Sequence, residues 1–202
     1  MKRRALLEIA AVVGTGAAFA ILVQILPKLL VIVPCIAFWL SYVVVRASRD
    51  RSVLAEWGLR LDNLRESARL PAIFVVVAAA GIFAFRAVAG LRPLPSWAWG
   101  MFLVYPIWSL FQQLFVQSLL AANFVRLGVR RSSTVLITAL LFGAVHLPDV
   151  PLALLCTLAG AFWTVCFLRV PNLLPLALAH GWIGTLTYAW LLERDPLAFP
   201  YP

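Results

Sequence analysis

The sequence predicts an all-α fold, a polytopic transmembrane helical bundle with about seven transmembrane helices. Three observations predict this fold class. Of 202 residues, 63% are apolar and only 12% are charged, the mean hydropathy is +0.96, and apolar runs of span length recur along the chain. So little polar surface cannot cover a water-soluble globule, whereas about twenty apolar residues can cross a bilayer as a helix. We expect residues 1–202 to form a single integral membrane domain.

The apolar runs place the predicted spans at residues 5–26, 29–45, 70–90, 97–125, 133–146, 152–168 and 173–192. Lys2, Arg3 and Arg4 precede the first run as in a secretory signal, but the run continues to Leu26, so we expect an uncleaved anchor. The fifth run is short. We expect its neighbours to shield it, or its backbone to continue past His146 inside the protein.

Basic residues are distributed unevenly between alternate loops. With a cytoplasmic N-terminus, thirteen of the seventeen Lys and Arg residues face the cytoplasm, and the other side keeps only Lys28, Arg86, Arg92 and Arg194. The positive-inside rule therefore predicts an integral protein of a bacterial inner membrane with its N-terminus in the cytoplasm. It also accounts for the net charge of +9, so we expect membrane lipids as partners and no nucleic acid.

Residues 46–69 form the one sizeable polar segment. We expect a loop with a short interfacial helix and with Trp57 at headgroup depth. Proline pairs predict tight turns at residues 93–95 and 148–151. The three cysteines, Cys35, Cys156 and Cys166, lie in apolar runs without metal-ligand spacing and are predicted to be small core residues. We predict no metal or cofactor, and the sequence does not indicate an oligomeric state.

Polar residues inside the predicted spans are the candidates for function, because polar side chains are costly in hydrocarbon. In the fourth span they share an arc of roughly 140° at 100° per residue and should point inward; they are Ser109, Gln112, Gln113 and Gln117. His146 and His180 also lie in apolar surroundings. Such residues often form interhelical hydrogen bonds, so the residues alone leave structural and catalytic roles open.

Three segments in order carry a family resemblance: residues 111–117 (FQQLFVQ), 142–148 (FGAVHLP) and 176–181 (LALAHG). Together they resemble the CPBP family, the CAAX protease and bacteriocin-processing proteins also called Abi, whose usual motifs are EExxxR, FxxxH and HxxxN. The resemblance covers residues 97–192. It implies an intramembrane endopeptidase that acts on a membrane-associated or lipidated peptide.

The resemblance also implies roles for individual positions. Phe142 with His146, and His180, match the second and third motifs, while other positions depart: Gln112 and Gln113 stand where the glutamates belong, Gln117 where the arginine belongs and Gly184 where the asparagine belongs. Losing the acids and the arginine together leaves no buried unpaired charge. A carboxamide cannot take a proton near neutral pH, so Gln112 cannot be the general base.

If hydrolysis survives these changes, His146 is the best remaining base, with Gln112 or Gln113 orienting water and His180 donating to the oxyanion. We expect these four residues to line one cavity. Counting 1.5 Å per residue from the loops puts Gln113 and His146 about 20 Å from the cytoplasmic face but His180 only about 12 Å. That difference in depth stands against a common site.

Two other functions remain open. A non-catalytic relative could keep the cavity and bind a peptide, a lipid tail or a partner membrane protein through its amide and imidazole groups. A small transporter is less favoured, because the sequence shows no acidic residue among the candidates inside the spans. Cleavage by the wild-type chain but not by His146→Ala would distinguish the endopeptidase from the non-catalytic relative.

Overall fold

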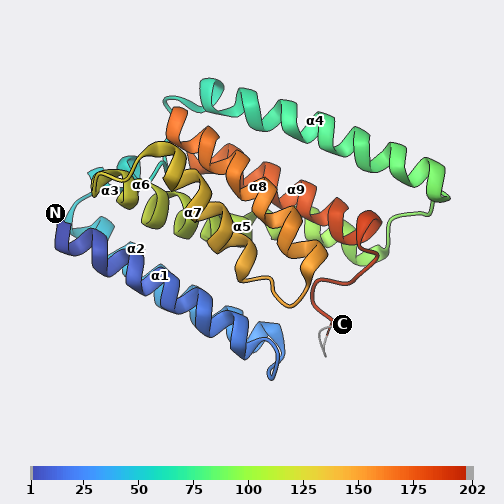
Figure 1. The fold of residues 1–202 in the computed structure, drawn as a ribbon, viewed down its shortest axis with the longest axis horizontal. Coiled ribbons are helices and arrows are strands. Elements are labelled where there is room, and N and C mark those ends of the chain that lie inside the picture. Colours follow the sequence, from blue (N-terminus) through green and yellow to red (C-terminus); the bar gives the residue numbers. More distant parts are fainter. Residues whose placement is uncertain (1, 199–202) are drawn as a thin grey trace.

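The computed structural model describes residues 2–198, and within them every regular element is helical (Figure 1). The elements in chain order are α1 (Lys2–Leu22), α2 (Lys28–Arg49), α3 (Ser52–Glu56), α4 (Leu64–Ala89), α5 (Ser96–Gln113), the π-helical η1 (Leu114–Ala121), α6 (Ala122–Arg126), α7 (Arg131–Ala144), α8 (Val150–Arg169), α9 (Leu173–Leu186) and the π-helical η2 (Thr187–Leu191). In Figure 1, α1 and α2 run along one edge, α4 runs along the opposite edge, and the remaining long helices lie between them.

Five of these helical stretches are long and apolar enough to cross a bilayer: α1, α2, α4, the continuous stretch from Ser96 to Arg126, and α8. The shorter α7 and the α9–η2 stretch fill the two other predicted positions. The all-helical membrane fold class is confirmed, and seven spans are compatible with it. The first predicted span ends four residues early, at Leu22, because a turn precedes Pro27 and proline restricts the residue before it.

After α7 the helix ends, but the backbone N–H groups of the following turn still have hydrogen-bond partners. α7 ends at Ala144, two residues before the predicted end, and turn hydrogen bonds follow: His146 N–H donates to the Gly143 carbonyl at 3.0 Å, and Asp149 N–H donates to the His146 carbonyl at 3.1 Å. The Asp149 carboxylate then accepts from Leu152 N–H at the start of α8. Irregular backbone is tolerated at depth when its polar groups are paired in this way.

Glycines let α9 approach α5 closely. A Cβ at Gly181 would lie 2.6 Å from the Pro106 backbone nitrogen, so only a residue without a side chain fits there. Small residues at helix interfaces permit such contact in membrane bundles. The contact holds the part of α9 that carries His180 against the polar face of α5.

The polar segment between α2 and α4 covers the beginning of α9. Leu173 N–H donates to the Gly58 carbonyl at 2.8 Å, and the Asn172 amide donates to the Arg60 carbonyl at 2.9 Å. Asn172 is only 1% exposed. The short helix predicted in this segment is present as α3. The Trp57 side chain is 1% exposed and packs inside the protein, against Tyr42, and its depth relative to the headgroups stays a prediction.

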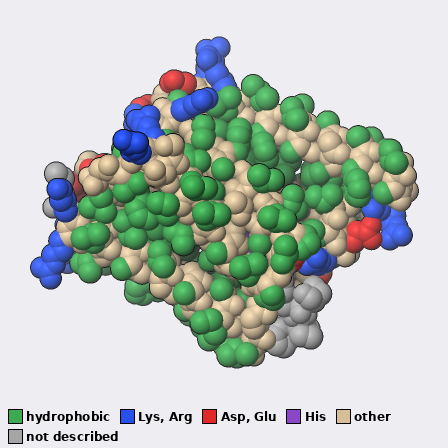
Figure 2. All heavy atoms as spheres, in the orientation of Figure 1, with side chains coloured by type: hydrophobic (Ala, Val, Ile, Leu, Met, Phe, Trp, Pro, Cys, Tyr) green, Lys and Arg blue, Asp and Glu red, His purple; other side chains and the backbone are tan. Residues whose placement is uncertain are grey.

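The sides of the bundle are apolar, and the charges lie at its ends. Figure 2 shows hydrophobic side chains across the middle of one face, with Lys and Arg gathered at the end where α1 begins and a smaller mixed group of charges at the other end. Large apolar side chains such as Val76, Leu103 and Leu158 are more than two-thirds exposed. An apolar belt between charged ends is the surface of an integral membrane protein.

Candidate active site

The polar stripe of the fourth span points into the protein, as predicted. Ser109 and Gln117 are fully buried, Gln113 is 1% exposed, and Gln112 is half-buried. Gln113 ends α5 and Gln117 lies in η1, so the stripe continues from the α-helix into the wider π-helical turn. Several of its polar atoms have no hydrogen-bond partner among the described residues, namely Ser109 Oγ, Gln112 Oε1, Gln113 Oε1 and both amide atoms of Gln117.

His180 meets Gln113, although counting along α9 had placed it at another depth. The Gln113 Nε2 and His180 Nδ1 atoms are 3.1 Å apart. An amide nitrogen can only donate, so His180 Nδ1 accepts this hydrogen bond and the neutral ring carries its proton on Nε2. His180 is 8% exposed and faces the interior. Its Nε2–H group is therefore a hydrogen-bond donor within the bundle.

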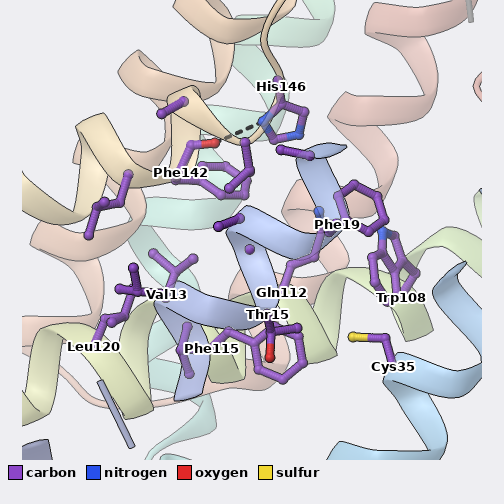
Figure 3. A pocket seen from close by; sticks show the side chains of 18 residues that line it. Val13, Thr15, Phe19, Cys35, Trp108, Gln112, Phe115, Leu120, Phe142 and His146 are labelled. Carbon is purple, nitrogen blue, oxygen red and sulfur yellow. Dashed lines mark hydrogen bonds between the residues drawn. The ribbon is translucent and has the colours of Figure 1, made fainter. Parts of the chain in front are cut away.

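His146 has the opposite proton arrangement. Its Nδ1 lies 2.8 Å from the carbonyl oxygen of Phe142, and a carbonyl can only accept, so Nδ1 carries the proton and Nε2 keeps a lone pair. Figure 3 shows the His146 ring at one end of a cavity and the Gln112 side chain extending from α5 toward that end. His146 Nε2 thus keeps a lone pair in a cavity that Gln112, whose amide can bind water, also lines.

The candidate residues divide between cavities instead of lining one. Gln112 and His146 line two adjoining cavities of about 250 and 320 Å³ that also run along α1. His180 and Gly184 line a third, of about 460 Å³, and Gln113 is buried behind it. These cavities do not bring the four residues together as expected. The Phe142 ring contacts both histidines, with its centroid 5.3 Å from that of His146 and 5.6 Å from that of His180.

Gly184, at the position where the third motif carries asparagine, faces an aromatic ring. A Cβ built at Gly184 would lie 2.7 Å from Cε1 of Tyr105 and 3.3 Å from its hydroxyl oxygen. Tyr105 is 9% exposed, and its ring centroid is 5.9 Å from that of His180. The tyrosine therefore fills the space that a larger residue at position 184 would need. The sequence analysis did not single out Tyr105, since no motif position marks it.

Glu8 is a buried acid that no sequence pattern marked. It lies in α1, inside the first predicted span, and is 7% exposed. Its carboxylate accepts from the Tyr42 hydroxyl at 2.5 Å and from the Asn123 amide at 2.7 Å. The premise that the spans contain no acid was therefore wrong, since Glu8 lies within the predicted span 5–26. This acid is a bonded structural group, distant in sequence from the motif residues.

Comparison with known proteins bears on this arrangement. Residues 92–186 match the family described as type II CAAX prenyl endopeptidase Rce1-like. The matched segment contains Gln112, Gln113, His146, His180 and Gly184, and it is consistent with the CPBP family. The predicted resemblance is therefore confirmed, and it supports a CPBP-type intramembrane protease at the level of the family. No curated protein and no solved structure matches the chain.

Proposed function

We propose that this chain, with its Rce1-like segment at residues 92–186, is an intramembrane endopeptidase that cleaves a membrane-associated, lipidated peptide and uses histidine in place of glutamate as the base. The observation that carries the proposal is that the two histidine rings carry their protons on opposite nitrogens. His146 offers a lone pair on Nε2, and His180 offers Nε2–H. A hydrolase needs one group of each kind, a proton acceptor for water and a donor for the developing oxyanion.

The proposed step follows from these atoms. His146 Nε2 takes a proton from a water molecule held by Gln112, and the water oxygen forms a bond to the carbonyl carbon of the peptide. The carbonyl π electrons move to its oxygen, which accepts a hydrogen bond from His180. The protonated His146 then gives its proton to the leaving amine as the C–N bond breaks. For one carbonyl to reach both histidines, the Phe142 ring has to rotate aside.

The cavity walls favour a lipidated substrate. The two cavities that contain Gln112 and His146 are lined mainly by apolar side chains such as Val12, Phe19 and Trp108. Apolar walls with a few polar groups bind an apolar ligand and orient its polar part. The matching family is described as type II CAAX prenyl endopeptidase Rce1-like, and a prenyl chain with its peptide suits an apolar lining with a few polar groups. We propose membrane lipids as the other partners of this chain.

The charge distribution supports a cytoplasmic N-terminus in a bacterial inner membrane, as the positive-inside rule predicts. Arg126 and Arg131 flank the turn that ends the α5–α6 stretch, and Lys2, Arg3 and Arg4 begin α1. In this orientation the polar segment that covers α9 is cytoplasmic. Protease added to sealed vesicles of known orientation should then cut this segment only from the cytoplasmic side.

A cleavage assay tests the enzyme proposal. The full chain is reconstituted in liposomes with a fluorogenic S-prenylated CAAX peptide, and the same peptide without its prenyl group is the matched substrate control. We expect the wild type to cleave the prenylated peptide and His146→Ala to lose a factor of about 10² to 10⁴ in kcat, the usual contribution of a positioned base. Gln112→Glu should raise kcat. Equal turnover by wild type and His146→Ala would refute the proposal.

The second candidate function is binding without cleavage. It is favoured by the amides at positions 112 and 113, which cannot take a proton, and by the Phe142 ring, which contacts both histidines. In this case the prenylated peptide binds to the wild type and remains intact over long incubation. Activity that appears only in Gln112→Glu would show that the chain is a scaffold whose site geometry persists.

A further inference from the structure

The Tyr105 side chain borders the cavity of His146 and also the cavity of His180. It lines the 320 Å³ cavity together with Gln112 and His146, and it also lines the 460 Å³ cavity together with His180. Phe142 also borders cavities on both sides, but its ring offers no hydrogen-bond donor. Tyr105 and Tyr188 both bring a hydroxyl to these two cavities. Of the two, Tyr105 has its ring centroid 5.9 Å from that of His180, so it is the tyrosine that we consider beside this histidine.

The packing of α5 against α9 fixes this position. The close contact of Gly181 with Pro106, the residue after Tyr105, brings the two helices together, and Gly184 provides the space that the tyrosine ring occupies. The Tyr105 hydroxyl oxygen lies 3.3 Å from the point where a Cβ of residue 184 would be. His180 and Gly184 are one helical turn apart on α9, so the Tyr105 ring packs against the face of α9 that carries His180, with its centroid 5.9 Å from that of the imidazole.

We propose that the Tyr105 hydroxyl is the second hydrogen-bond donor to the oxyanion, acting beside His180 Nε2–H. This inference rests on the proposed function. When the water oxygen bonds to the peptide carbonyl carbon and the π electrons move to the carbonyl oxygen, that oxygen accepts one hydrogen bond from the imidazole and one from the phenol. No proton leaves either donor in this step, and both hydrogen bonds are released when the C–N bond breaks and the carbonyl reforms.

A second donor is needed on physical grounds. A tetrahedral oxyanion in a water-poor site is stabilised by donors already aimed at it, and removing one donor typically costs a factor of about 10² to 10³ in kcat. Gly184 offers no side chain for this purpose. A phenol keeps its proton at neutral pH and can donate it to an anionic oxygen. Tyr105 thus supplies chemistry that position 184 lacks in this chain.

The test is the liposome assay with the S-prenylated CAAX peptide, applied to Tyr105→Phe. This variant keeps the ring against Gly184 and removes only the oxygen. We expect kcat to fall by a factor of about 10² with KM changed less than threefold, because the lost hydrogen bond forms only in the transition state. The matched control is Tyr42→Phe, which removes a buried hydroxyl bonded to Glu8 at 2.5 Å; it should lower thermal stability and leave kcat within about threefold.

A rescue pair separates catalysis from packing. Tyr105→Ala opens the space beside position 184, and Tyr105→Ala combined with Gly184→Asn fills it with an amide donor. We expect the double variant to recover at least about tenfold in kcat over Tyr105→Ala, a part of what one donor contributes. Unchanged kcat in Tyr105→Phe, while His146→Ala is inactive, would overturn this inference and leave the proposed function standing. Wild-type turnover no higher than that of His146→Ala would overturn both.

Discussion

Replacing Glu8 by alanine should destabilise the fold much more than replacing an exposed acid. The buried Glu8 carboxylate accepts from Tyr42 and from Asn123. Tyr42 would lose a hydrogen bond to a charged group, worth about 1.5 to 3 kcal/mol. Asn123 would lose less, about 1 kcal/mol, because its amide still donates to the Leu119 carbonyl at 2.9 Å. The sum is a loss of about 3 kcal/mol in the free energy of unfolding.

The measurement is thermal unfolding in detergent micelles, where a loss of this size lowers Tm by roughly 6 to 12 °C in a chain of this length. Glu8→Gln should cost only about 1 kcal/mol, because its oxygen accepts from Asn123 and its amide donates to the Tyr42 hydroxyl, which can reverse its role. Glu56→Ala is the matched control: Glu56 is about half exposed and pairs with Arg126 at 3.2 Å, and exposed ion pairs contribute about 0 to 1 kcal/mol. Equal Tm values for Glu8→Ala and Glu56→Ala would refute the reasoning.

Three other substitutions test particular contacts, each by thermal unfolding. Glu193→Gln should lower stability by about 2 kcal/mol, because Arg86 is 4% exposed and relies on Glu193 for its 2.5 Å ion pair; an unchanged Tm would contradict this. Gly58→Ala should cost about 1 to 3 kcal/mol, since φ is +81° and the new Cβ would lie 3.2 Å from the Asn172 backbone; a stable variant would show that the turn can relax. Asn172→Ala should lower the free energy of unfolding by about 2 kcal/mol. It should also speed proteolysis of the polar segment at residues 58–63, to which Asn172 is hydrogen-bonded.

The helices could be predicted because each is encoded locally. An apolar run of bilayer length forms a helix whatever its neighbours are, and the inward stripe from Ser109 to Gln117 follows from helical periodicity alone. The hydrogen-bonded pairs could not be predicted in the same way. Glu8 is stabilised by residues 34 and 115 positions away, and no local pattern indicates which distant helices will supply those donors.

The depth of His180 shows why counting along a helix failed. The count assumed that α9 begins at the membrane surface, at Asn172. The structure covers this residue with the polar segment from Gly58 to Asn63, whose carbonyl and amide groups bond to it. The helix therefore begins within the protein, and eight residues bring His180 to Gln113. A loop that folds over a helix terminus changes the origin of the count, and this is a tertiary effect.

The contacts of Trp57 and Tyr105 could not be predicted for the same reason. Tryptophan is common at the headgroups, but that tendency does not indicate that the Trp57 carbonyl accepts from the Ser118 hydroxyl at 2.6 Å and that its side chain packs inside the bundle. Tyr105 matters because a glycine on another helix makes room for it. Both positions depend on which helices pack together.

The Phe142 ring has a consequence for the membrane as a barrier. Imidazoles and amides buried in a bilayer protein can order a file of water, and a continuous file would let protons leak between the two aqueous sides. Here the Phe142 ring contacts the rings of both His146 and His180, and it carries no group that donates or accepts a proton. An aromatic side chain in this position interrupts a file of water that would run past both imidazoles where the ring contacts them.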